Sequence, residues 1–163
     1  MCWRTGWIMS AVAIGALLMG VIVYLGYRSG SAVYFLAGIV PDTFNYSISS
    51  GTISNSIPSF LHIYAFILLT AIVLNPSRTG LALICSGWMA VELFFEIGQH
   101  PYFANHLAEA VPAWFVDFPF LEVADSYFLT GTFDPVDVLF ILFGTAAAFL
   151  TLYKVLRREV YHV

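Results

Sequence analysis

The residues most able to do chemistry are carboxylates and an amide at the end of an apolar stretch, residues 80–100. Glu92, Glu96 and Gln99 fall within roughly 60° of one another around a helix axis, at about 100° per residue. A charged side chain in hydrocarbon costs at least ~2.5–3.5 kcal/mol, so such groups usually face a partner or a wet cavity. We therefore expect the rest of the chain to supply polar partners for this stripe.

Two other places supply titratable groups. His62 lies near the start of another apolar run, and Asp134 and Asp137 open the last one. Asp134-Pro135 is also typical of a helix start, and Asp137 would lie at the favourable end of the helix dipole. His62 has an equally ordinary interpretation, a helix-end histidine bonded to a carbonyl. Both interpretations stay open beside ligand binding, for which the candidates are His62, Glu92, Glu96, Gln99, Asp134 and Asp137.

These groups favour binding over catalysis. Carboxylates and an imidazole suit a hard or borderline cation, but the Glu-x-x-His spacing of di-iron bundles is missing. No serine, threonine or cysteine is paired with a base, as an activated nucleophile requires. We predict no metal ligand and no catalytic residue, and the sequence names no cofactor.

Composition decides the class of protein. The chain has 163 residues, of which 60% are hydrophobic and 10% charged, whereas soluble domains carry about 25% charged residues. We therefore predict an all-α, single-domain integral membrane protein. No basic patch points to nucleic acid. The expected partners are membrane lipids and either a second copy of the chain or another membrane protein.

Four apolar runs are expected to cross the membrane, at about 7–27, 57–74, 81–98 and 135–153. The first is longer than the ~7–15 residues of a signal-peptide core, so we predict an uncleaved helix. Ser56 is expected to cap the second helix, with Pro58 in its first turn. Residues 29–56 and 99–133 are the expected outer loops. The second of these is rich in aromatic residues typical of a membrane interface, and a short helix is expected at 106–111, capped by Asn105.

The basic residues predict an orientation. With four crossings, all of them except Arg28 share one side: Arg4, Arg78, Lys154, Arg157 and Arg158. The positive-inside rule then places both termini in the cytoplasm and both long loops outside. The acidic groups would meet near the outer face of a plasma (inner) membrane.

Several of these residues form a pattern that resembles the VanZ-like membrane proteins. The matching segments are Phe60-Leu61-His62, the E-x-x-Q motif Glu96–Gln99, and Gly131–Asp137 followed by Gly144. The resemblance covers residues 56–153. It implies a small bacterial inner-membrane protein acting near the cell envelope, in a family associated with glycopeptide resistance, and it implies no particular reaction. Pro58-Ser59 stands where the family often has Asp-Lys, which removes a basic residue.

Three functions remain open at this point. The first is a multi-pass protein of the cell envelope whose acidic cavity, open to the outer leaflet, binds a lipid head group, a cation or an envelope precursor. The second is a small accessory subunit of a larger membrane complex. The third is a membrane-embedded enzyme that uses His62, Glu92 and Glu96 as acid–base groups on a lipid substrate.

Overall fold

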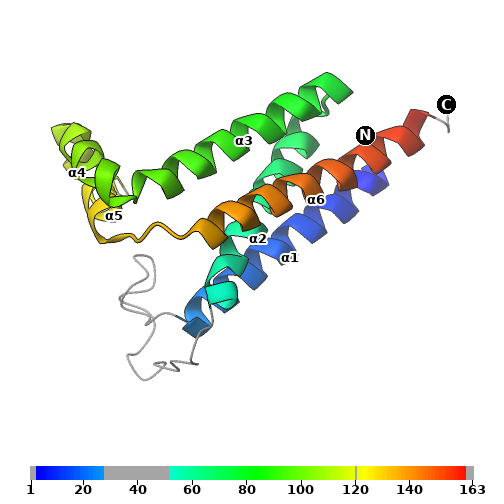
Figure 1. Ribbon diagram of the computed structural model, residues 1–163. Coiled ribbons are helices and arrows are strands. Elements are labelled where there is room, and N and C mark those ends of the chain that lie inside the picture. Colours follow the sequence, from blue (N-terminus) through cyan, green and yellow to red (C-terminus); the bar gives the residue numbers. More distant parts are fainter. Residues whose placement is uncertain (1–2, 28–51, 120, 161–163) are drawn as a thin grey trace.

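The computed structural model describes residues 3–27, 52–119 and 121–160, and side chains at 5–23, 55–119 and 121–157. Within these ranges every regular element is a helix (Figure 1), which confirms the all-α prediction for this part of the chain. Most of the first expected loop, residues 29–51, lies outside the described residues. The elements are α1 (Trp3–Tyr27), α2 (Thr52–Leu74), α3 (Arg78–Gly98), α4 (Pro101–Ala110), the 3-10 helix η3 (Ala113–Asp117), α5 (Ala124–Thr130) and α6 (Pro135–Val160).

Four of the helices are long and apolar enough to cross a membrane. Their apolar spans are Thr5–Val23, Asn55–Leu74, Arg78–Gly98 and Pro135–Arg157. The helix α1 leaves large apolar side chains exposed, with Trp7 at 63% and Ile22 at 65% of full exposure. An apolar face of this extent is unfavourable in water and suits lipid. Together these features indicate a multi-pass membrane protein.

The helix α2 lies at the centre of the bundle. It contacts α1, α3 and α6, and Ile63, Ile67 and Leu68 on it are fully buried. It approaches α6 closely at Gly144, where an added Cβ would lie 2.6 Å from Ile63 Cγ2 and 2.7 Å from the Phe60 carbonyl oxygen. A small residue at such a contact lets two helices pack closely, as is common in membrane proteins.

The two ends of the bundle differ in charge. At one end the Arg78 guanidinium lies 5.4 Å from the centroid of the Tyr153 ring, so α3 begins where α6 ends. The first residues of α1 lie at this same end (Figure 1). The last turns of α6 carry Lys154 and Arg157. The opposite end, where α2 and α6 begin and α3 ends, holds the four carboxylates of Glu92, Glu96, Asp134 and Asp137. The orientation relative to the cytoplasm stays a prediction.

The start of α2 differs from the sequence prediction. The helix begins at Thr52, so Pro58 lies within it and not in its first turn. The polar residues before Asn55 continue the helix beyond the apolar span. Proline removes one N–H bond to the carbonyl four residues earlier, and neighbouring helices and side chains can satisfy the freed group. Hydropathy therefore marks where the apolar span begins, at Asn55, whereas the helix itself begins earlier, at Thr52.

The segment 99–133, which we call the end cap, contains more helix than the single short helix expected from the sequence. It contains α4, η3 and α5, and α4 packs against α5. The helix expected at 106–111 begins earlier, at Pro101. Its cap is His100, whose Nδ1 accepts the Tyr102 N–H at 3.2 Å, and not Asn105. A proline at the first helical position is the signal that the sequence analysis overlooked.

The contact at Gly144 predicts a selective loss of stability. Gly144→Ala should lower the free energy of unfolding in detergent by about 1–3 kcal/mol, because the added methyl meets backbone as well as side chain. Gly87→Ala is the matched control, since nothing lies within 4 Å of the added Cβ and alanine is the better helix former. Equal stability of the two variants would contradict the close packing of α6 on α2.

Candidate functional site

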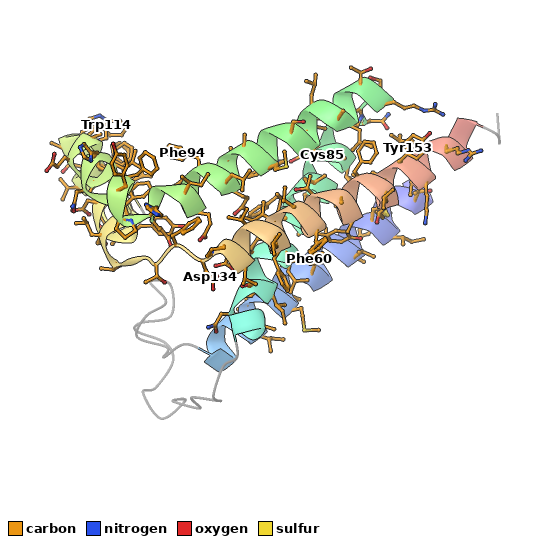
Figure 2. The ribbon with its side chains drawn as sticks, in the orientation of Figure 1. Phe60, Cys85, Phe94, Trp114, Asp134 and Tyr153 are labelled. Carbon is orange, nitrogen blue, oxygen red and sulfur yellow. The ribbon has the colours of Figure 1, made fainter. Side chains whose placement is uncertain are left out.

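A polar pocket of about 320 Å³ lies where α2 and α6 begin and α3 ends. We call it the acidic pocket. Figure 2 shows Asp134 where the chain segment from the end cap enters α6. The structure brings all the site residues predicted from sequence to this one pocket: His62 of α2, Glu92 and Glu96 of α3, Gln99 just after α3, and Asp134 and Asp137 at the start of α6.

Glu96 joins α3 to α6. Its Oε1 accepts the backbone N–H of Asp134 at 2.8 Å, and the side chain is buried. The Asp134 Oδ1 in turn accepts the Val136 N–H at 2.9 Å, so Asp134 caps the helix as its sequence context suggested. A carboxylate at a helix N-terminus is favoured by the unpaired amides and the helix dipole. Glu96 therefore acts mainly to position the pocket wall.

Asp137 joins α6 to α2. Its Oδ1 accepts the Ser59 hydroxyl at 3.2 Å. Because a carboxylate can accept about four hydrogen bonds, this contact leaves Asp137 with capacity for a ligand. The sequence analysis treated Ser59 only as a position where a basic residue was missing. In the structure it orients a carboxylate of the pocket.

Glu92 lies one turn deeper along α3 and is half-buried. Among the residues that the structure describes, it has no hydrogen-bond partner, although it lines the pocket beside Glu96. A half-buried carboxylate without such a partner is costly unless water or a ligand supplies one. Glu92 is thus the group of the pocket with the most free acceptor capacity.

His62 brings α1 close to the pocket. An added Cβ on Gly20 would lie 3.5 Å from both Nε2 and Cδ2 of the ring. The ring also stacks on Phe66, with 6.1 Å between centroids. Within the described residues, no carbonyl group accepts a hydrogen bond from His62. The interpretation of His62 as a helix-end histidine bonded to a carbonyl therefore has no support from these residues. Packing on both sides fixes the imidazole at the pocket wall.

Gln99 packs against the backbone at Gly131. An added Cβ at Gly131 would lie 2.3 Å from Gln99 Cδ, so a larger residue there would force the Gln99 side chain to move. The pocket also contains residues that the sequence analysis did not assign to it: Asn55, Pro58, Ser59, Phe95, Tyr127, Thr132 and Ile141. Tyr127 and Thr132 come from the end cap, whose fold no helical or strand periodicity predicts.

The charge of the pocket restricts what it can hold. Four carboxylates line it, those of Glu92, Glu96, Asp134 and Asp137, and its lining includes no lysine or arginine. Such a site attracts cations and hydrogen-bond donors and repels anions. Within the described part of the chain, no group of three or more His, Cys, Asp or Glu is arranged to hold a metal ion.

Comparisons of the chain with protein-family models, curated proteins and solved structures find no match. The resemblance to the VanZ-like family therefore stays a prediction that rests on the motifs themselves.

The link between Glu96 and Asp134 predicts a stability change. Glu96→Ala should lower the free energy of unfolding by about 1–3 kcal/mol, because it leaves a part-buried amide without its acceptor. Glu96→Gln keeps a carbonyl acceptor and should cost less. Glu109→Ala, on the exposed surface of α4, is the control and should have little effect in the same denaturation experiment. A Glu96→Ala variant as stable as the control would contradict this role.

Proposed function

We propose that the chain is a VanZ-like multi-pass protein whose acidic pocket binds the positively charged or hydroxyl-rich head group of a lipid or an envelope precursor. One observation carries the proposal. Four carboxylates, an imidazole and the two amides of Asn55 and Gln99 line a single pocket, and no lysine or arginine of that lining neutralises the carboxylates. Buried charges are stable only when they are paired and hydrogen-bonded. A cationic, donor-rich ligand would supply both.

The position of the pocket favours a membrane ligand. The apolar spans of α2 and α6 begin at Asn55 and Pro135, and that of α3 ends at Gly98. Residues of the acidic pocket lie within a few positions of each of these limits. In a membrane the pocket would therefore lie close to the level of the lipid head groups, where a head group could enter from the side.

We further propose that this end of the bundle faces the outside of a plasma membrane, with both termini in the cytoplasm. The argument is the distribution of basic residues. Arg78, Lys154 and Arg157 lie at the opposite end from the acidic pocket, and positively charged flanks stay in the cytoplasm.

The charge of the pocket predicts selective binding of cations. Spermidine should raise the thermal unfolding temperature of the protein in an uncharged detergent, because a ligand stabilises the state that binds it. Inorganic phosphate at matched ionic strength should not. Glu92→Gln combined with Asp137→Asn should reduce spermidine affinity at least tenfold, while circular dichroism shows unchanged helix content.

The matched control removes two acidic groups elsewhere. Glu109→Gln with Asp117→Asn changes the net charge equally, at exposed residues of the end cap outside the acidic pocket. This variant should bind spermidine like the wild type. Equal weakening in both double variants would mean that spermidine senses only the overall charge, and stabilisation by phosphate would contradict the proposal directly.

The orientation predicts labelling by a membrane-impermeant maleimide. In a background with Cys2→Ser and Cys85→Ala, Ala113→Cys in the end cap should react in intact cells of a bacterial host. Thr79→Cys, at the opposite end of α3, should react only after lysis. Both positions are exposed, so access to the reagent differs only through the membrane. The reverse pattern would invert the proposed topology.

A further inference from the structure

A second cavity, of about 520 Å³, lies between the end of α3 and the end cap. We call it the aromatic pocket. Its walls include Phe94, Phe95, Leu107, Phe115, Tyr127 and Phe128, and no charged residue lines it. Figure 2 shows aromatic side chains, Phe94 among them, gathered between α3 and the end cap. The aromatic pocket is open on part of its surface, because Phe94 and Phe95 on its wall are partly exposed.

The aromatic pocket adjoins the acidic pocket. Phe95 and Tyr127 line both cavities. Their rings meet edge to face, with 5.7 Å between centroids and 90° between planes. A single pair of side chains thus forms the boundary between a space lined by carboxylates and a space lined by hydrocarbon.

The carboxylates of one pocket would suit a positively charged head group, and the aromatic walls of the other would suit a hydrocarbon tail. Resting on the proposed function, we propose that the pockets hold a single amphiphile, with an amine head in the acidic pocket and a hydrocarbon tail in the aromatic pocket. The aromatic pocket has no charged side chain to pair with the head, and the carboxylates of the acidic pocket would repel a phosphate or carboxylate head. The aromatic pocket falls within the roughly 300–1,000 Å³ of known small-molecule sites.

The tail would enter from the membrane. Phe94 and Phe95 are 52% and 42% exposed, so the wall contributed by α3 is open to its surroundings. These residues lie in the last turns of an apolar span that ends at Gly98. A lipid tail beside this part of α3 could therefore reach the aromatic pocket from the bilayer, while its head remains at the level of the acidic pocket.

The proposal predicts that affinity depends on chain length. Butylammonium, octylammonium and dodecylammonium would be titrated against bound spermidine, with the protein in phosphatidylcholine nanodiscs and partitioning corrected with empty nanodiscs. Dodecylammonium should displace spermidine at concentrations at least tenfold lower than butylammonium. Dodecanoate, which has the tail without the positive charge, should not displace it.

Filling the aromatic pocket should remove the tighter binding of dodecylammonium relative to butylammonium. Ala110→Phe adds a ring to its lining, and Val123→Phe does so at another lining residue, so that a folding defect in one variant leaves the other informative. Both should bind butylammonium and spermidine normally and lose the tenfold advantage of dodecylammonium. Ala113→Phe is the matched control, because it also replaces an alanine by phenylalanine in the end cap but lies outside the aromatic pocket. This variant should still bind dodecylammonium at least tenfold more tightly than butylammonium.

The possible results separate the two proposals. Displacement that is independent of chain length, with spermidine still bound by the wild type, would overturn the single amphiphile and leave the proposed binding of cations in the acidic pocket intact. Retention of the chain-length effect in both filled variants would also overturn it. Absence of any amine binding by the wild type would overturn the proposed function itself.

Discussion

The hydrogen bond from the Asp134 amide to the Glu96 carboxylate is the contact on which the arrangement of the site depends. It joins the end of α3 to the start of α6 at 2.8 Å, across a gap of 38 residues in sequence. A negative charge at a helix N-terminus is stabilised by free amides and by the helix dipole. The same acidic residue would be costly in an apolar helix without that partner. Glu96 therefore has a structural reason to be acidic, whereas Glu92 and Asp137 keep more free acceptor capacity in the acidic pocket.

The helices are connected differently at the two ends of the bundle. At the basic end, the link between α2 and α3 is only three residues long, 75–77, and Arg78 packs over Tyr153. At the acidic end, α2, α3 and α6 are joined through side chains and through the end cap. Short turns leave little room for a cavity between helices, whereas a long connection can fold into walls of its own. The acidic and aromatic pockets both lie at the end with the long connection.

Phe95 and Tyr127 mark the change from one chemistry to the other. Successive residues of a helix point about 100° apart, so Phe95 and Glu96 make different contacts, although both line the acidic pocket. Phe95 packs against Phe128 and Tyr127 of the end cap, while Glu96 binds α6. The last turn of α3 thus lines both the aromatic and the acidic pocket.

The sequence by itself determined the four apolar helices and the identity of the principal polar residues. This was possible because charges are expensive within an apolar span, so each one there is informative, and because helical spacing groups Glu92, Glu96 and Gln99 on one face. Only the tertiary structure decided which of them act as caps or links, that Ser59 and Tyr127 belong to the acidic pocket, and that residues 99–133 form a helical cap beside an aromatic cavity. These features arise from contacts between segments distant in sequence, and such contacts leave no periodic pattern along the chain.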